Sequence, residues 1–183
     1  ADLERGKSVM ILATCSFMLR PAIAALRSAG VPFHNPHRST HGAWNPLRGG
    51  AQRLLAYLRP DPNVYGDEAR IWNWGEAKAW TEVVRAKGVL SSGGKRWVSE
   101  LGSDEDRSDE IIDRADGKAT FGDCWEHLRD VFSKGEAIEW LEDNLLASRR
   151  QFMEYALTVA RKRGAKALRD EPRLTVGSIH SVK

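Results

Sequence analysis

Cysteine is scarce in this 183-residue chain, which contains only Cys15 and Cys124. A disulfide framework is therefore not expected, and two thiols this far apart in the sequence are typical of a reducing, cytoplasmic compartment. A chain of this length can bury more than about two thirds of the surface of its unfolded form without such crosslinks. We expect both thiols to be buried.

Long hydrophobic runs are absent as well. No stretch approaches the roughly 18 to 20 apolar residues of a membrane-spanning helix, and residues 1–7 show no signal-peptide pattern. With 42% hydrophobic and 29% charged residues, the composition is that of an ordinary globular protein. The sequence predicts a cytoplasmic protein without a membrane partner.

The common catalytic motifs are missing too. The sequence contains no G-x-x-x-x-G-K-S/T, G-x-G-x-x-G, C-x-x-C, H-E-x-x-H or G-x-S-x-G motif. His34, His37 and His41 could hold a metal in a hydrolase, but a zinc site usually needs a fourth ligand, and histidines that anchor a loop are the simpler interpretation. The carboxylate pairs of the middle segment lie in polar runs that favour solvated loops over a glycosidase pair. We predict no catalytic residue and no metal site.

Acidic residues are few at both ends of the chain. Residues 1–59 carry 8 Lys/Arg against 2 Asp/Glu, residues 60–146 carry 11 against 20, and residues 147–183 carry 9 against 3. The overall charge of +3 therefore hides two basic ends and an acidic middle. This distribution favours two ends that fold together into one surface facing a polyanion, with the middle inserted, although an ordinary mosaic surface explains the charge alone equally well.

The first block of the chain predicts a small parallel sheet. Residues 8–14 form an apolar run typical of a buried strand. Residues 16–30 have helical spacing, given by Phe17, Met18, Ile23 and Leu26 and closed by Gly30, and residues 31–35 form a second short strand. A strand, a helix and a strand in this order make a βαβ unit, which requires parallel pairing.

The remainder of the chain predicts helices and one returning strand. Helices are expected at 49–59, 75–86, 109–115, 122–132, 135–146 and 147–163. Residues 91–109 combine a Ser/Gly turn with an acidic cluster and predict a flexible stretch. Residues 173–183 return to strand character at the very end of the sequence, so we expect the chain to be a piece of a longer protein.

Nucleic-acid binding is the function class for which the chain has suitable residues. Exposed tryptophans could stack on bases, but most of the seven have apolar neighbours and are expected in the core, with Trp44 the candidate for exposure. Six arginines of the terminal blocks could contact phosphates, although each taken singly fits a solvated helix face. They are Arg20, Arg27, Arg38, Arg48, Arg149 and Arg150.

Three segments together resemble one enzyme family. RLTVGSIHSVK resembles motif V of the UvrD/Rep/PcrA-type superfamily 1 DNA helicases, where a strand leads into Thr/Ser-Leu/Ile-His-Ser/Ala-x-Lys-Gly-x-Glu. SVMILATCSFMLRPAIAALRSAGVPFHN resembles the motif IV region with its G-I/V-P-F/Y turn, and RGGAQRLLAYLRP resembles the helix that follows. The chain departs from the family at residues 13–16, where Ala-Thr-Cys-Ser replaces Tyr-Arg-x-Asn, and it ends at Lys183, before the Gly and Glu of motif V.

This resemblance implies a mostly helical α/β fold, in which the two chain ends form a small parallel sheet around an inserted helical domain. Residues 1–59 would begin the RecA-like domain 2A, residues 60–165 would form the accessory 2B-like domain, and residues 166–183 would return to domain 2A. The implied parent is an ATP-dependent helicase that unwinds DNA from 3′ to 5′ in repair or replication. Its implied partners are single-stranded or duplex DNA and the other RecA-like domain, 1A, of the same parent chain.

The same resemblance implies five DNA-contacting residues. Arg20 matches the later arginine of motif IV, whereas Ser178 and His180 carry a hydroxyl and an imidazole that suit phosphate contact; a hydrogen bond to a neighbouring loop is the other interpretation of His180. The full set is Thr14, Ser16, Arg20, Ser178 and His180.

ATP and Mg²⁺ are cofactors of the implied parent, and none is expected in this chain, which lacks the phosphate loop and the arginine-finger region of the family. The chain alone is therefore expected to lack ATPase activity. The alternative from another class is a stand-alone nucleic-acid-binding or protein-binding module without catalytic activity.

Overall fold

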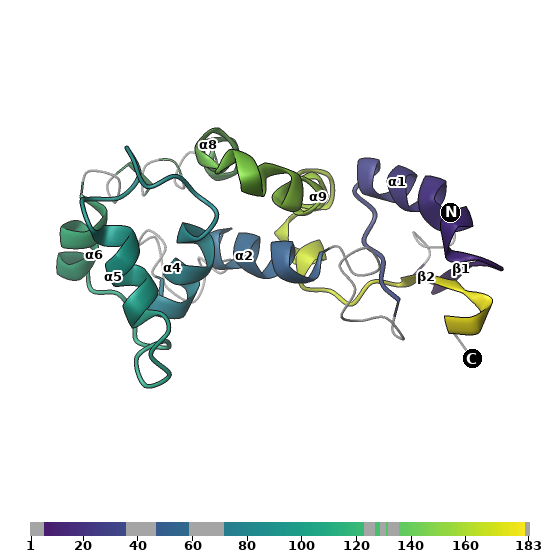
Figure 1. Ribbon diagram of the computed structural model, residues 1–183, viewed down its shortest axis with the longest axis horizontal. Coiled ribbons are helices and arrows are strands. Elements are labelled where there is room, and N and C mark those ends of the chain that lie inside the picture. The colour runs from purple at the N-terminus through teal and green to yellow at the C-terminus, as the bar shows by residue number, and fades with distance from the viewer. Residues whose placement is uncertain are drawn as a thin grey trace. The chain divides into compact units, whose positions relative to one another are not determined.

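The computed structural model describes residues 6–35, 47–58, 72–122, 127–128, 131 and 136–181 (Figure 1). The chain divides into two compact units, which we call unit 1 (Ala1–Gln52 with Met153–Lys183) and unit 2 (Arg53–Phe152). Both ends of the chain thus belong to one unit, and the middle of the chain forms the other. The unit boundaries lie 7 and 13 residues before the boundaries predicted after residues 59 and 165.

The described part of the chain is mostly helical, with one small sheet. Its elements are β1 (Val9–Ala13), η1 (Ser16–Leu19), α1 (Arg20–Ser28), α2 (Arg48–Leu58), α4 (Trp74–Thr81), α5 (Gly94–Leu101), α6 (Arg114–Phe121), α8 (Ala137–Asn144), α9 (Ala147–Arg163), η3 (Ala165–Leu168), β2 (Leu174–Ser178) and η4 (Ile179–Ser181), where η marks a 3-10 helix. The coarse fold class predicted from the sequence is confirmed. Helices α2 and α9 each begin in one unit and end in the other.

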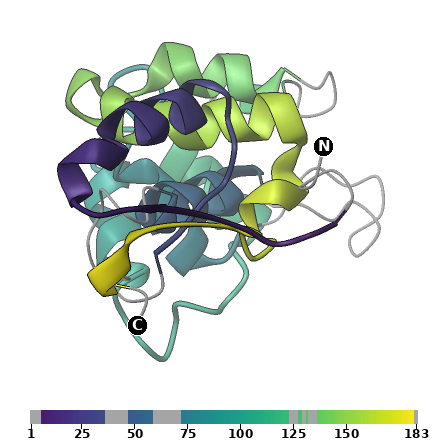
Figure 2. The same ribbon diagram turned by 90° about the vertical axis from the view of Figure 1, so that its right-hand side faces the viewer.

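The sheet of unit 1 pairs the two ends of the chain. β1 and β2 are parallel and in register from Val9–Leu174 to Ala13–Ser178. Figure 2 shows the two strands side by side, and in both views α1 lies to one side of them. The small parallel sheet predicted from the two chain ends is therefore present.

The prediction that the first strand is buried is wrong for one of its faces. Successive side chains of a strand point to opposite faces of the sheet. Val9 and Ile11 are half-buried, whereas Met10 and Leu12 on the other face are 54% and 45% exposed. Only one face of this strand is packed against other described residues. The exposed face carries apolar side chains as well, so the run is apolar although half of it is not buried.

The predicted strand at residues 31–35 is reduced to a single bridge. The His34 amide donates to the Leu174 carbonyl oxygen over 3.1 Å, and the Val176 amide donates to the His34 carbonyl oxygen over 3.0 Å. Pro32 has no N–H group, so a ladder of hydrogen bonds cannot extend through it. Among the described residues β2 therefore lies between β1 and the His34 bridge.

The predicted helix at residues 16–30 is divided into two parts. η1 forms first, with the Met18 amide donating to the Cys15 carbonyl oxygen over 3.1 Å, and α1 follows with Pro21 in its first turn. Leu19 is buried, whereas Phe17 and Met18 are 64% and 55% exposed. Helical spacing therefore does not make Phe17 and Met18 core residues here, because the 3-10 turn brings the next residue, Leu19, inward instead.

Helix α9 holds the end of α1 in place. The Lys162 ammonium donates to the Ser28 carbonyl oxygen over 2.8 Å, and the Arg163 guanidinium donates to the Gly30 carbonyl oxygen over 2.7 Å. Gly30 has φ +61°, and a Cβ there would lie 3.0 Å from the Thr158 carbonyl oxygen. Glycine at this position therefore permits both the turn after α1 and the close approach of α9.

Aromatic side chains fill the core of unit 2. Trp72, Trp74 and Trp80 are buried as predicted, and the Trp80 ring lies 5.6 Å from Tyr57 and 5.9 Å from Phe121 between centroids. Aromatic rings at such distances contribute about 0.5 to 1.5 kcal/mol per pair beyond the burial of their surface. Most of the described tryptophans therefore serve packing; Trp44 and Trp125 lie outside the described residues.

Helix α5 occupies the segment that we expected to be flexible. It follows Gly93, whose φ is +77°, and it buries Val98, while Arg96 and Glu100 form an ion pair of 2.8 Å along its exposed side. The polar composition of residues 94–101 belongs to the exposed face of a helix whose buried face has few residues. Contacts with the rest of unit 2 stabilise such a short helix.

A short pairing replaces the start of the helix predicted at residues 109–115. Asn73 and Ile111 form an antiparallel bridge, and the Ile112 amide donates to the Trp72 carbonyl oxygen over 2.8 Å. Because the Ile112 amide donates to Trp72, it makes no helical hydrogen bond, and α6 begins only at Arg114. The predicted helices at 75–86 and 135–146 are present in shortened form as α4 and α8.

Candidate nucleic-acid interface

The carboxyl ends of β1 and β2 lie at the same edge of the sheet. The strands are parallel, and their last register pair joins Ala13 to Ser178. Thr14 and Ile179 therefore leave the sheet next to each other, and Figure 2 shows η1 and η4 at this common end. In open sheets with parallel strands, ligands bind in the crevice outside the carboxyl ends of the strands. We call the residues 14–20 and 178–180 the carboxyl-edge site.

All five predicted DNA-contacting residues lie on the two segments that include or follow the paired strand ends. Thr14, Ser16 and Arg20 lie on the segment that follows β1, whereas Ser178 and His180 lie at the end of β2 and in η4. Thr14, Ser16, Arg20 and His180 are exposed, and Ser178 is 7% exposed. Four of the five side chains are thus accessible to a ligand in solution.

Unit 1, which contains the carboxyl-edge site, carries a net positive charge. Unit 1 contains 13 Lys/Arg against 5 Asp/Glu, a net charge of +8, whereas unit 2 contains 15 against 20, a net charge of −5. No Asp or Glu occurs between Glu4 and Asp61. Within the described residues no carboxylate pairs with Arg20, which leaves its guanidinium available for an anion. The two units thus carry opposite net charges, which the overall charge of +3 conceals.

The other arginines proposed from the sequence do not all join this site. Arg27 is exposed on α1 and Arg48 begins α2, both in unit 1. Arg149 and Arg150 belong to unit 2, where Arg150 donates to the Glu142 carbonyl oxygen over 3.2 Å. Arg38 lies outside the described residues. Arg20 is thus the predicted arginine that lies on the segment following β1.

A metal site is not supported in the part of the chain that the structure describes. No group of three or more His, Cys, Asp or Glu side chains is arranged to hold an ion there. His34 is engaged through its backbone with β2, and His37 and His41 lie outside the described residues.

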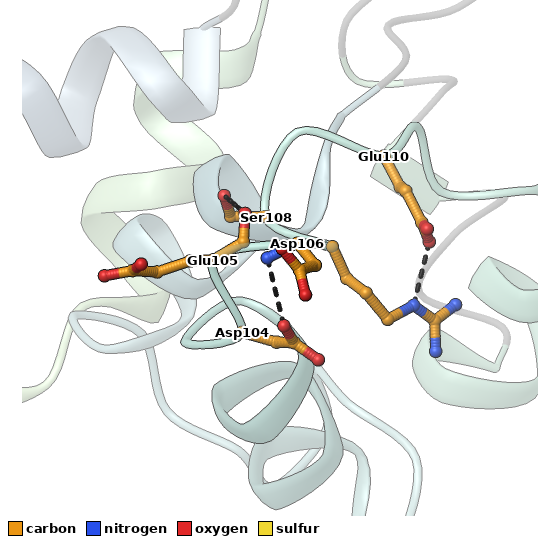
Figure 3. Close-up of polar contacts among 6 residues, drawn as sticks. Asp104, Glu105, Asp106, Ser108 and Glu110 are labelled. Atoms are coloured by element: carbon orange, nitrogen blue, oxygen red, sulfur yellow. Dashed lines mark hydrogen bonds and ion pairs between the residues drawn. The ribbon is translucent and has the colours of Figure 1, made fainter.

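The carboxylates of the acidic cluster take part in a local turn. The Asp104 carboxylate accepts the Asp106 amide over 3.0 Å, and Arg107 donates to the Glu110 carboxylate over 2.9 Å (Figure 3). The Ser108 hydroxyl donates to the Glu105 carbonyl oxygen over 3.4 Å. These side chains are mostly exposed, as expected for a solvated loop.

A groove in unit 2 offers little selectivity for a charged ligand. Its volume is about 530 Å³, and it is lined by Thr81, Glu82, Lys95, Arg96, Ser99 and Glu100. Glu82 is paired with Arg53 over 3.0 Å, and Arg96 with Glu100. Burial lowers the pKa of the Lys95 ammonium, which donates to the Val84 carbonyl oxygen over 3.3 Å. Opposite charges thus largely compensate one another within this groove.

Two features of the carboxyl-edge site are not evident from the sequence. Cys15, expected to be buried, is exposed between Thr14 and Ser16. Phe17 is exposed as well, although its apolar character and spacing favour a core position. No pattern in the sequence distinguishes a 3-10 turn from the first turn of an α-helix at these residues.

No family model matches the chain, and neither a curated protein nor a solved structure matches it. Among the helices of the described residues none combines the length and the apolar character needed to cross a bilayer.

Proposed function

We propose that this chain is part of an ATP-dependent DNA helicase similar to the UvrD/Rep/PcrA family. Unit 1 then belongs to the RecA-like domain 2A and contacts DNA, and unit 2 is the accessory 2B-like domain. The observation that carries the proposal is the parallel register of β1 and β2. It brings the segment that resembles motif IV next to the segment that resembles motif V, although they lie at opposite ends of the sequence.

The chemistry of the carboxyl-edge site supports contact with a phosphate backbone. Arg20 supplies a permanent positive charge, Thr14 and Ser16 supply hydroxyl groups, and His180 supplies an imidazole, all from exposed positions. Such side chains contact phosphates without regard to base sequence. This suits an enzyme that moves along DNA, because its contacts must be repeated at every nucleotide.

ATP and Mg²⁺ enter this proposal only through the parent enzyme. The sequence has no phosphate loop, and the described residues offer no group of carboxylates for a metal ion. The residues present therefore do not fit the nucleotide, and we assign no step of ATP hydrolysis to this chain. Its proposed part is to hold DNA and to carry the accessory domain.

Salt-dependent binding to single-stranded DNA tests the proposed site. We expect the purified chain to bind a labelled oligothymidylate of roughly 16 nucleotides, with an affinity that falls as salt rises from about 50 to 200 mM. Arg20→Ala should lower the affinity and reduce the slope of log K against log salt by about 0.7, the contribution of one phosphate contact. Fluorescence anisotropy measures both quantities.

The matched control for this experiment is Arg96→Ala, which removes an exposed arginine from unit 2. We expect it to leave the affinity and the slope unchanged. Equal effects of Arg20→Ala and Arg96→Ala would show that binding does not use the carboxyl-edge site.

The alternative is a stand-alone binding module, and the exposed Met10 and Leu12 favour a protein partner for it. A module of this kind would bind its partner with full affinity in isolation. Helicase identity would instead require that the chain, joined to a RecA-like domain 1A, gain DNA-dependent ATPase activity that Arg20→Ala reduces. That comparison separates the two functions.

A further inference from the structure

Lys95 lies in the first turn of α5 and lines the groove of unit 2, which this helix forms with the end of α4. Its Nζ atom donates to the Val84 carbonyl oxygen over 3.3 Å. Within the described residues Lys95 forms no ion pair with a carboxylate, although Glu82 acts on it electrostatically. Lys95 is half-buried and thus differs from exposed lysines of the same unit, such as Lys87.

The electrostatic surroundings of Lys95 favour its uncharged amine. Burial lowers the pKa of the ammonium, the Glu82 carboxylate opposes this effect, and the Arg149 guanidinium of α9 adds to it. The other charged groups that line the groove, Arg96 and Glu100, are paired with each other. A lysine with a lowered pKa has more neutral amine near neutral pH, and the neutral amine is the nucleophilic form.

Ser99 provides a hydroxyl group beside this amine. It lies four residues after Lys95 in α5, so the two side chains share one face of the helix, and both line the groove. Ser99 is exposed, and its hydroxyl makes no hydrogen bond within the described residues. An amine and a hydroxyl donor on one wall suit acyl transfer to nitrogen. The amine attacks the carbonyl carbon, and the hydroxyl stabilises the negative charge that develops on the carbonyl oxygen.

We propose that Lys95 is a site of acylation by an uncharged acyl thioester held in this groove. The neutral Nζ attacks the carbonyl carbon and forms an N–C bond, the C–S bond breaks, and the thiolate leaves with its electron pair. The thiolate takes up the proton that the nitrogen releases, so the products are an Nε-acyl lysine and a free thiol. The paired charges that line the groove favour an uncharged donor over an anionic acyl phosphate, because they give an anion no net attraction.

Acylation of Lys95 changes the charge of unit 2. The acyl group removes the ammonium charge, which leaves 14 cationic side chains against 20 carboxylates and lowers the net charge from −5 to −6. Nζ keeps one N–H group, which can still donate to the Val84 carbonyl oxygen. The modification therefore makes an acidic unit more acidic without leaving that acceptor unpaired, and it does not depend on the DNA contacts proposed above.

Acetylation rates resolved by residue test the proposal on the purified chain. S-acetyl-N-acetylcysteamine is the uncharged thioester probe, and peptide mass spectrometry measures the rate at each lysine. At about pH 7.5 we expect Lys95 to react faster than Lys87, and the Lys95 rate should level off below about pH 10.4, where an ordinary lysine is half neutral. Acetyl phosphate should show a smaller preference for Lys95. Equal thioester rates at the two lysines would overturn the proposal, and an equal preference with acetyl phosphate would overturn the assignment of an uncharged donor.

Two variants assign the reactivity to the groove. Ser99→Ala should slow acetylation of Lys95 by about 2- to 10-fold, the effect of one uncharged hydrogen bond on a barrier, and leave Lys87 unchanged. Arg149→Ala should move the Lys95 pH profile to higher pH, because it removes a cation that disfavours the ammonium. Arg150→Ala removes the next arginine and is its matched control. If neither Ser99→Ala nor Arg149→Ala changes the Lys95 profile, the groove does not activate the amine and the proposal is refuted.

Measurement in concentrated urea separates the effect of the fold from that of the local sequence. In the unfolded chain Lys95 and Lys87 should react at nearly equal rates, since the groove no longer exists. A preference for Lys95 that persists in urea would refute the role of the groove. Ser99 and Arg149 are exposed, so their replacement should leave the circular dichroism spectrum and the unfolding midpoint unchanged. Each variant that meets this condition is a valid probe of reactivity.

Discussion

The Tyr155 hydroxyl donates a hydrogen bond of 2.5 Å to the Val31 carbonyl oxygen. This bond joins α9, near the end of the chain, to the segment that leads from α1 to the His34 bridge. The Tyr155 side chain also packs against Phe33. One residue thus holds the two parts of unit 1 together through both a polar and an apolar contact.

Tyr155→Phe should destabilise unit 1 by about 1 kcal/mol, because it removes one buried hydrogen bond and keeps the ring contact. Hydrogen exchange measured by mass spectrometry should show faster exchange in β1 and β2. Thr158→Val is the control, since the exposed Thr158 hydroxyl bonds only within α9, to the Glu154 carbonyl oxygen. If both variants exchange at the rate of the unchanged chain, the Tyr155 bond does not stabilise the unit.

The stability of unit 1 should fall at alkaline pH. Burial raises the pKa of the Tyr155 phenol above its usual value of about 10. Above that usual value the unfolded chain loses the phenolic proton while the folded chain keeps it, so the free energy of unfolding decreases as the pH rises. Urea unfolding between about pH 9 and 11 should show a steeper loss for the unchanged chain than for Tyr155→Phe. Parallel curves would contradict this assignment.

Gly102→Ala should destabilise unit 2 by about 1 to 3 kcal/mol, the usual cost of overpacking. A Cβ at Gly102 would lie 2.5 Å from the Trp74 carbonyl oxygen and 2.6 Å from the Lys78 Cβ. Urea unfolding followed by tryptophan fluorescence reports on unit 2, where Trp74 and Trp80 are buried. Ser99→Ala, on the exposed side of α5, should change stability by less than about 0.5 kcal/mol; an equal midpoint for both variants would refute the close approach.

The Cys15 thiol should react readily with a disulfide reagent in the folded chain, because it is exposed. In a Cys124→Ser background, rising concentrations of oligothymidylate should slow this reaction in proportion to the fraction of chain bound. The reason is that Cys15 lies between Thr14 and Ser16 within the carboxyl-edge site. A rate that does not respond to bound DNA would place the DNA interface elsewhere.

The purified chain should show no ATP turnover, with or without single-stranded DNA, because it lacks a phosphate loop. A coupled phosphate-release assay measures this, and a mock purification from cells without the chain sets the background. Turnover that follows the concentration of the chain through successive columns would contradict the prediction.

The sequence predicts the paired elements of unit 1 well where apolar pattern and local signals agree. The strand around Ile11 and the long helix that contains Tyr155 form as predicted, and the returning strand around Val176 forms but ends at Ser178, where a 3-10 helix follows. The strand around His34 does not, because Pro32 removes a donor that the ladder would need. Which residues pair across the sheet depends on contacts between the two chain ends, and no local pattern encodes that register.

Exposure at the carboxyl-edge site was the least predictable property. Phe17 and Leu19 are both apolar and lie two residues apart, yet only Leu19 is buried. The difference arises from the 3-10 geometry of η1, which turns three residues per turn rather than 3.6. Similarly, α5 forms where composition favours a flexible stretch, because burial of Val98 within unit 2 outweighs a weak local preference for helix.

Arg53 and Phe152 are the first and last residues of unit 2, and the Arg53 guanidinium carbon lies 5.7 Å from the centroid of the Phe152 ring. The entry and the exit of the inserted unit are therefore neighbours. Insertions with adjacent ends are tolerated by a host fold because they leave the host's own chain path nearly unchanged. A short link between residues 52 and 153 would therefore span the gap that removal of unit 2 leaves, and it would join the remaining parts of α2 and α9.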